Sequence, residues 1–150
     1  MSQENPDPIA GCPSCGTRNR VRAAAPGVPH CGSCGAPLPW LADGDGDSFA
    51  AVVERSPLPV LVDFWAPWCG PCRMVEPVVR QMSRDLAGRL KVVRVNTDEA
   101  PGLGQRFQVM GIPTLMLFDR GQVRDRITGA VDAATMRGWL DTRLPAGRAG

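Results

Sequence analysis

Six cysteines arranged as three Cys-x-x-Cys pairs constrain this chain more than any other feature of its sequence. The pairs are Cys12 with Cys15, Cys31 with Cys34, and Cys69 with Cys72. Two residues between cysteines suit a metal knuckle, in which a tight turn aims both sulfurs at one ion, or a dithiol that can close to a disulfide. A framework of structural disulfides would need an oxidising compartment, and the sequence offers no signal for one. We therefore interpret the cysteines as metal-binding or redox pairs.

The first two pairs are predicted to form one four-thiolate zinc site. The segment between Cys15 and Cys31 has the length that is typical of zinc ribbons. Gly16 and Gly35 follow the pairs and permit the backbone geometry of a tight turn. The segment is short and poor in apolar residues, so metal binding would supply its folding free energy. We expect residues 1–37 to form a zinc-binding ribbon that holds one Zn²⁺ ion through the thiolates of Cys12, Cys15, Cys31 and Cys34.

Other uses of these four cysteines stay open, namely two disulfides or four free thiols, because the redox conditions are unknown. His30, the only histidine, directly precedes Cys31 and could replace a thiolate as ligand. Four cysteines already satisfy the tetrahedral preference of zinc, however, and the direct neighbour of a ligand points elsewhere. We expect His30 to lie exposed in a loop.

Charge and hydropathy argue against nucleic-acid and membrane partners. The chain has a formal net charge of +2 and no long block of like charge. Arg18, Arg20 and Arg22 form a basic stripe, but Glu4 and Asp7 offset two of these three charges. Four thiolates and one zinc ion add two negative charges, which leaves the ribbon at about −1. The chain shows no secretory signal and no apolar run of about 18 residues. We therefore expect a cytoplasmic monomer in which the stripe is a solvated or protein-contacting face.

Residues 38–144 are predicted to form one α/β domain, followed by a flexible tail at 145–150. The run 60–66 is apolar on both faces apart from Asp63, as expected for a central strand covered by helices on each side. The other expected elements are a strand at 38–42, a polar linker at 43–47, a helix ending near 55 and capped by Asp47 or Ser48, a helix at 72–86, a strand at 91–96, a helix at 101–107, a hairpin of 115–119 with 122–128, and a helix at 132–144.

The helix expected after Cys72 has one apolar face. Apolar residues recur there at helical spacing, and we assign them to the core, including Met74 and Met82. Pro71 suits the first helical turn, and Pro77 removes a backbone donor and should bend the helix.

The third pair is therefore expected at a strand-to-helix junction. A cysteine at a helix N-terminus faces unpaired amides and the positive end of the helix dipole, which stabilises its thiolate. Cys69 is the expected nucleophile, and Cys72 is the thiol that resolves the mixed disulfide.

Asp63 is the one carboxylate inside the apolar strand. Desolvation raises the pKa of a carboxyl group, which suits it to proton transfer near neutral pH. The alternative is an acid that leans to solvent or caps a neighbour. Because Asp63 precedes a dithiol by a few residues, we favour proton transfer with Cys72, direct or through water, with Arg94 tuning the acid.

Three segments resemble the thioredoxin family closely. They read Val-Asp-Phe-Trp-Ala-Pro-Trp-Cys-Gly-Pro-Cys over residues 62–72, Gly-Ile-Pro-Thr over 111–114 and Thr-Gly-Ala over 128–130. With its four N-terminal cysteines, the chain looks like the zinc-ribbon subgroup of the bacterial family, thioredoxin 2. The resemblance covers roughly residues 40 to 144. It implies a mixed central sheet flanked by helices, a cis peptide before Pro113 and cytoplasmic reduction of protein disulfides. Arg94 is a departure, because many members carry a lysine near the buried acid.

The resemblance also implies a substrate surface and a partner that recharges the dithiol. An extended substrate segment would lie on an apolar surface and pair with the backbone of Ile112. The residues expected at this surface are Trp68, Gly70, Pro71, Ile112, Pro113 and Gly129. The alternative for Trp68 is ordinary packing, but an aromatic residue directly beside an exposed nucleophile more often shields it or contacts partners. The Gly70-Pro71 loop favours a reducing dithiol, which a thioredoxin reductase linked to NADPH through a flavoprotein would recharge.

Two classes of function remain open from the sequence. The leading interpretation is an enzyme, a protein-disulfide reductase with the redox-active disulfide Cys69–Cys72 and a zinc site that is structural or senses oxidation. An oxidase or isomerase would differ by a higher dithiol potential. The alternative class is a binding module, in which the ribbon recruits a partner and the thioredoxin-like domain is a scaffold. A zinc ion at Cys69 and Cys72 is disfavoured, because Pro71 lies beside the thiols and no further knuckle is available.

Overall fold

The computed structural model describes residues 8–145 of the chain, and a five-stranded mixed sheet lies at its centre. The strands run in the order β3 (Trp40–Gly44), β5 (Lys91–Asn96), β4 (Val60–Trp65), β6 (Thr114–Asp119) and β7 (Gln122–Thr128). The first three are parallel, whereas β6 and β7 continue the sheet in antiparallel pairing. The expected α/β fold with a mixed central sheet is confirmed.

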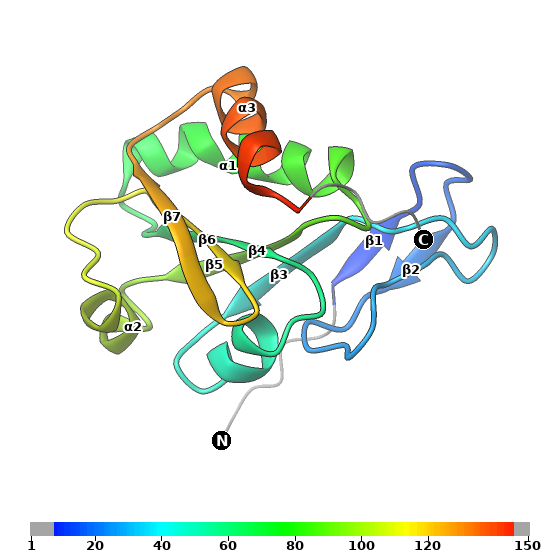
Figure 1. Ribbon diagram of the computed structural model, residues 1–150, viewed down its shortest axis with the longest axis horizontal. Helices are drawn as coiled ribbons and strands as arrows, with labels where there is room; N and C mark the ends of the chain where they lie inside the picture. The colour runs from blue at the N-terminus through cyan, green and yellow to red at the C-terminus, as the bar shows by residue number, and fades with distance from the viewer. Residues whose placement is uncertain (1–7, 146–150) are drawn as a thin grey trace.

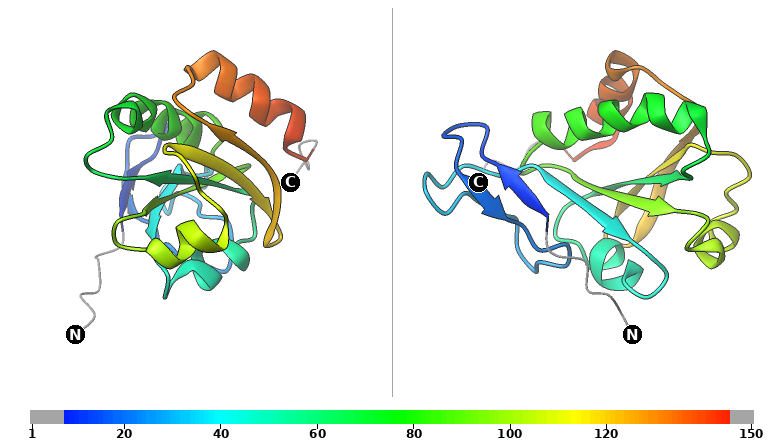
Figure 2. Two further views of the ribbon diagram at one scale, coloured as in Figure 1. Left: turned by 90° about the vertical axis from the view of Figure 1, so that its left-hand side faces the viewer. Right: turned by 180° about the vertical axis from the view of Figure 1, so that it is seen from behind.

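Helices cover both faces of this sheet (Figures 1 and 2). On one face lie α1 (Gly70–Asp85) and α3 (Ala133–Arg143), and on the other lie the short η1 (Ala50–Glu54) and α2 (Pro101–Arg106). Side chains alternate along β4, so Val62 and Phe64 pack into the core on the η1 side while Leu61 packs into the core against α1. Asp63 lies two positions after Leu61 on the strand and therefore points to the same face of the sheet. Its carboxyl group therefore lies on the α1 side of the sheet.

Local sequence explains where the later elements begin and turn. Asp132 precedes α3 and its carboxylate accepts a hydrogen bond from the backbone N–H of Thr135 at 2.8 Å. The hairpin of β6 and β7 turns at Arg120 and Gly121, which have φ values of 53° and 78°. Glycine adopts this left-handed conformation without strain. The pairing of β6 with β7 around these two residues confirms the predicted hairpin.

Three predictions about local structure are wrong. The expected polar linker is partly strand, because Asp43 and Gly44 pair with β5. Neither Asp47 nor Ser48 caps the following helical segment, since Ser48 and Asp45 instead exchange hydrogen bonds of 2.9 and 3.0 Å in the preceding turn. Met74 does not belong to the core.

The position of Met74 on α1 explains that last error. The buried face of α1 is formed by Cys72, Val75, Val79, Met82 and Ser83. Met74 lies off this face and is 69% exposed. Pro77 lies inside a helix that is assigned as continuous from Gly70 to Asp85.

The N-terminal segment forms a second, two-stranded sheet of β1 (Ile9–Gly11) and β2 (Arg18–Arg20). Figure 1 places this sheet, drawn in blue, at the far side of the molecule from α2. Cys12, Val21, Cys31, Leu38 and Trp40 share one small core, so residues on both sides of position 37 pack together. The proposed division of the chain at 37 and 38 stays a prediction.

Lys91 also connects the N-terminal segment to the rest of the molecule. Its Nζ donates hydrogen bonds to the carbonyl oxygens of Ala23 and Val52 and lies 4.1 Å from the centre of the Trp40 ring. Residues 1–7 of the predicted ribbon and 146–150 of the predicted tail lie outside the described residues. Within the described part of the chain, no helix has both the length and the apolar character that crossing a membrane requires.

Candidate active site and metal centre

Cys69 and Cys72 are joined by a disulfide at the N-terminus of α1. Cys69 is the N-cap residue, and its Sγ accepts a hydrogen bond from the backbone N–H of Cys72 at 3.2 Å. The helix begins at Gly70, two residues earlier than predicted, so Gly70 and Pro71 form its first turn. The pair thus lies where unpaired helix amides favour a negative charge on sulfur.

The disulfide is largely covered in this oxidised form. Cys69 is 4% and Cys72 is 2% exposed, so the expectation of an exposed sulfur at Cys69 is wrong here. Cys69 Sγ lies 3.7 Å from the carbonyl oxygen of Ile112. Ala66, Trp65 and Ile112 pack around the two cysteines. The backbone of Ile112 therefore borders Cys69 Sγ.

The loop before β6 holds the peptide that faces the disulfide. The peptide between Ile112 and Pro113 is cis, as the family resemblance implies. Gly129 donates its backbone N–H to the carbonyl oxygen of Pro113 at 2.8 Å and has a φ of 102°, which favours glycine. Pro113 itself is buried, whereas Ile112 and Gly129 are half-buried. On the expected substrate surface, Ile112 and Gly129 are therefore more accessible than Pro113.

Exposed apolar side chains lie beside the disulfide. Trp68 is 70% exposed, and its Nε1 donates to the carboxylate of Asp98 at 3.1 and 3.3 Å. A groove of about 930 Å³ extends from Trp68 along Val109, Met110, Gly111 and Ile112. Met110 is 95% exposed. The sequence analysis missed Met110, although its place directly before the Gly-Ile-Pro-Thr motif is a usable signal.

Asp63 and Arg94 form a buried ion pair between β4 and β5. They are paired residues in the register of β4 and β5, and Arg94 Nε lies 3.3 Å from Asp63 Oδ2. Asp63 is fully buried, and burial raises the pKa of its carboxyl group to about 6, although the charge of Arg94 opposes this rise. The structure therefore brings together the acid and the cation that the sequence singled out.

Glu76, which the sequence analysis did not single out, completes this charged group. Its Oε1 lies 3.4 Å from Arg94 Nη1 and accepts hydrogen bonds from Arg80 at 2.9 and 3.2 Å. The hydrogen bond from Arg80 lowers the pKa of Glu76. The spacing of one helical turn after Cys72 could have indicated its closeness to the dithiol.

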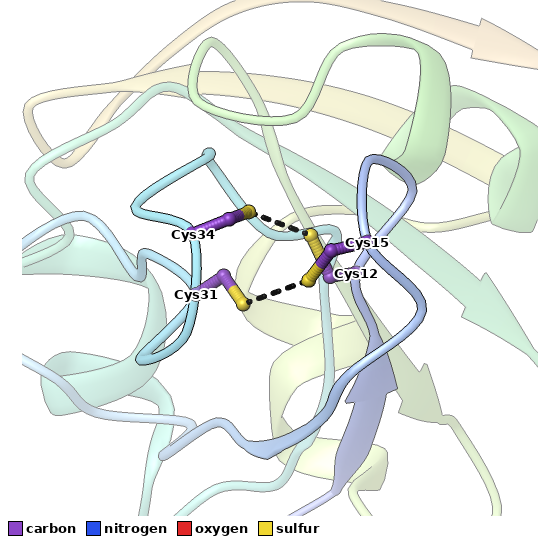
Figure 3. A group of neighbouring side chains, drawn as sticks. All are labelled: Cys12, Cys15, Cys31 and Cys34. Atoms are coloured by element: carbon purple, nitrogen blue, oxygen red, sulfur yellow. Dashed lines mark hydrogen bonds between the residues drawn. The ribbon is translucent and has the colours of Figure 1, made fainter.

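The other four cysteines form one cluster, and their Sγ atoms point toward one another (Figure 3). All four Sγ atoms lie within 4.8 Å of each other, with 3.5 Å between Cys12 and Cys34 and 3.6 Å between Cys15 and Cys31. A tetrahedral zinc ion with Zn–S bonds of about 2.3 Å requires neighbouring sulfurs about 3.8 Å apart. The cluster fits a tetrahedral thiolate site.

Each pair of cysteines in the cluster is shaped by the same turn. Gly16 donates its N–H to the carbonyl oxygen of Cys12, and Gly35 donates to that of Cys31, each at 2.9 Å. Both glycines have positive φ, as the knuckle prediction requires. Hydrogen bonds to Cys31 Sγ, led by the backbone N–H of Cys34, lower the pKa of this thiol to about 6. Thiolates are the form that binds metal.

Two further side chains mark the edge of this cluster. Asn19, which the sequence analysis did not consider, donates to Cys31 Sγ at 3.5 Å and accepts from Gly32 at 3.0 Å. His30 is exposed and its Nδ1 lies 2.8 Å from the Val28 carbonyl oxygen, as expected of a loop residue. Arg18, Arg20 and Arg22 are exposed.

Comparison with known proteins agrees with this geometry. The family model described as thioredoxin matches residues 41–142. Thioredoxin 1 of Synechococcus elongatus is 50% identical over 97 residues, which cover 65% of this chain and 91% of that protein. Thioredoxin of a Synechocystis species is 52% identical over the same shares. Chloroplastic thioredoxin M4 of Arabidopsis thaliana is 39% identical over 136 residues, which cover 87% of this chain and 69% of that protein. The chain belongs to the thioredoxin family of protein-disulfide reductases.

Proposed function

We propose that this chain reduces protein disulfides by dithiol–disulfide exchange at Cys69 and Cys72. The observation that carries the proposal is the disulfide at the N-terminus of α1, which faces the Ile112 carbonyl oxygen across the cis peptide loop. Asp63 lies buried on the same side of the sheet. These two observations support a role for Ile112 in pairing with a substrate backbone and a role for Asp63 in proton transfer.

The exchange takes two steps. In the reduced chain the Cys69 thiolate attacks one sulfur of the substrate disulfide, which forms a mixed disulfide and releases the other substrate sulfur as a thiolate. The Cys72 thiolate then attacks Cys69 Sγ, releases the second substrate sulfur and restores the Cys69–Cys72 disulfide. Helix amides stabilise the attacking thiolate, an effect for which thioredoxins are themselves a standard example.

Asp63 is the proposed acceptor of the Cys72 proton. A carboxyl group with a pKa of about 6 is largely ionised at neutral pH and can still give the proton back. A cavity of about 210 Å³ is lined by Cys72, Glu76 and Arg94, among others. It lies where a proton can move between Cys72 and the charged group, directly or through water.

Trp68 and the groove beside it are the proposed contact surface for an unfolded or extended substrate segment. Main-chain pairing with Ile112 would align the substrate, and the apolar groove would receive its side chains. A reducing partner, proposed to be an NADPH-linked flavoprotein reductase, returns two electrons to the disulfide after each cycle. We propose a cytoplasmic monomer that binds neither membrane nor nucleic acid.

The four-cysteine cluster is proposed to hold one Zn²⁺ ion. Cys12, Cys15, Cys31 and Cys34 would bind it as thiolates, and the ion would supply folding free energy to the ribbon. The sheet of β1 and β2, beside the first cysteine pair, lies away from the α1 N-terminus (Figure 1), which favours a structural role for the ion. A sensing role is supported by the exposure of Cys15 and Cys34. Peroxide titration with a zinc indicator distinguishes the two, because a structural site keeps its ion until the chain unfolds.

Reduction of insulin disulfides with dithiothreitol tests the proposed activity. Wild-type protein should accelerate insulin precipitation, and Cys69→Ser should abolish the acceleration. Cys34→Ser is the matched control, because it removes a cysteine of the cluster and should leave turnover in place. Retained turnover in Cys69→Ser would rule out the proposed reaction.

A further inference from the structure

The guanidinium of Arg94 is shared between two carboxylates. Its Nε lies 3.3 Å from Asp63 Oδ2, and its Nη1 lies 3.4 Å from Glu76 Oε1. Its Cζ lies 4.4 Å from the centre of the Trp65 ring. Arg94 is thus held from three sides, and only one of its nitrogens contacts the buried acid.

The contact with Asp63 is a single hydrogen bond and not a bidentate pair. Among the described residues, Asp63 Oδ1 has no hydrogen-bond partner, although Asp63 is fully buried. A guanidinium that faced Asp63 with two nitrogens would satisfy both oxygens and hold the carboxylate more strongly. The nitrogen that would complete a side-on pair with Nε is Nη2, which makes no hydrogen bond to Asp63, while Glu76 holds the guanidinium from its other side through Nη1.

Glu76 is in turn held from the solvent side. The side chain of Arg80, one turn further along α1, donates to Glu76 Oε1 through both Nε and Nη2. Glu76 is partly exposed at 37%, whereas the Arg94 side chain is 9% exposed. The four side chains therefore form a chain of alternating charge from the protein surface to the buried acid, in the order Arg80, Glu76, Arg94 and Asp63.

We propose that Glu76 is a positioning residue for proton transfer at the dithiol: it draws the Arg94 guanidinium toward the surface and so limits the hold of Arg94 on Asp63. The inference rests on the proposed disulfide reduction, because it assigns Asp63 the proton of Cys72. This role of Glu76 follows neither from the sequence motifs nor from the position of Asp63.

The charges around Asp63 give the direction of the effect. Arg94 faces it from β5 and Glu76 from α1, while the paired residue on β6 is the apolar Leu115. Glu76 raises the pKa of Asp63 through its negative charge, after burial, which is the largest cause of the rise. Without this charge, Arg94 would stabilise ionised Asp63 more strongly, and the pKa of Asp63 would fall.

A cavity beside Cys72 connects Glu76 and Arg94 with the proposed proton transfer. Cys72, Glu76 and Arg94 line the same cavity of about 210 Å³, together with Trp65 and Arg73. Arg73 donates through Nη2 to the carbonyl oxygen of Pro67, which also lines the cavity, at 3.1 Å. Two of the charged groups that border Cys72, Glu76 and Arg94, are thus those that act on the pKa of Asp63.

Carboxyl NMR titration of Asp63 in the full-length reduced protein tests the proposal. Glu76→Gln keeps a hydrogen-bond acceptor but removes the charge, and it should lower the pKa of Asp63 by roughly 0.5 unit or more. Arg80→Gln should raise it, because Glu76 then acts on Arg94 alone. Asp85→Asn, which removes another exposed carboxylate of α1, should leave it unchanged.

Insulin reduction measured across pH in the same variants separates this inference from the proposed function. In Glu76→Gln the acidic limb of the rate profile should move to lower pH by the same amount as the pKa of Asp63. An unchanged pKa of Asp63 in Glu76→Gln overturns the inference even if the wild type reduces insulin. A lowered pKa with an unmoved rate profile also overturns it, because Glu76 would then not act on the reaction. Wild-type protein without insulin reduction would instead contradict the proposed function.

Discussion

Asp63 on β4 and Arg94 on β5 are paired across the parallel strands, and Arg94 Nε lies 3.3 Å from Asp63 Oδ2. This one ion pair does not offset the burial of the acid, whose pKa is raised to about 6. A buried acid with a raised pKa destabilises the fold at neutral pH, and the proposed proton transfer requires that same property.

Replacing Asp63 should therefore stabilise the protein in a pH-dependent way. The folded pKa of about 6 lies above the ordinary 3.8, so the wild type loses unfolding free energy as pH rises from about 4 to 6. Asp63→Asn removes this loss and should be more stable than wild type at pH 7.5 by about 1–3 kcal/mol. The lower end of this range allows for the loss of the ion pair between Arg94 and Asp63. Denaturant unfolding at pH 4.5 and 7.5 measures the difference. A larger advantage of the variant at pH 4.5 would contradict this reasoning.

Lys91 should show the opposite kind of pH dependence. Burial lowers its pKa to about 8, below the ordinary 10.5, so between these values only the unfolded chain binds the proton. The unfolding free energy of the wild type should rise with pH in this window, by at most about 1.4 kcal/mol per pH unit. Lys91→Met should lack this rise. Because Lys91 is the only lysine, selective lysine labelling gives one NMR signal, and titration with an ordinary pKa would contradict the prediction.

The sequence was sufficient to predict the features that depend on local pattern. The apolar run at 60–66, the cap at Asp132 and the glycines Gly16 and Gly35 each act within a few residues, so their roles follow from propensity and spacing. The spacing of the four N-terminal cysteines likewise predicted one cluster. These predictions needed no knowledge of distant contacts.

Features set by packing could not be predicted in the same way. Met74 fits an apolar helical pattern, but the orientation of α1 on the sheet leaves it exposed. Glu76 looked like an ordinary solvent-facing residue, because its contact with Arg94 depends on how α1 crosses β5. Lys91 was predicted only to begin the strand at 91–96. Its burial depends on the N-terminal segment, which supplies the Ala23 carbonyl oxygen.

Removing the metal should affect the ribbon and not the dithiol. Chelation under reducing conditions should release one Zn²⁺ per chain and increase hydrogen exchange in residues 8–37, because the segment has only a small core of its own. Insulin reduction should stay within about twofold of the untreated protein, since the sheet of β1 and β2 in the ribbon lies away from the α1 N-terminus in Figure 1. Chelation that abolishes turnover while α1 stays protected would contradict a structural role for the ion.

Trp68 should matter for protein substrates and much less for small ones. Trp68→Ala removes an exposed aromatic side chain at the proposed contact surface, and kcat/KM for insulin should fall about fivefold or more. The rate with a small aromatic disulfide should change by less than about twofold. Val123→Ala, which trims another exposed apolar side chain on β7, serves as the matched control. Equal losses for both substrates would show that Trp68 acts on the disulfide and not on substrate contact.

The central claim is that Cys69 attacks the substrate and Cys72 resolves the product, and trapping the mixed disulfide tests it most directly. Cys72→Ser protein mixed with an oxidised protein substrate should accumulate a covalent adduct that peptide mass spectrometry locates at Cys69. Cys69→Ser should form none, because the remaining Cys72 lies inside α1 and lacks the N-cap position of Cys69. An adduct at Cys12, Cys15, Cys31 or Cys34, or equal trapping in both variants, would contradict the assignment.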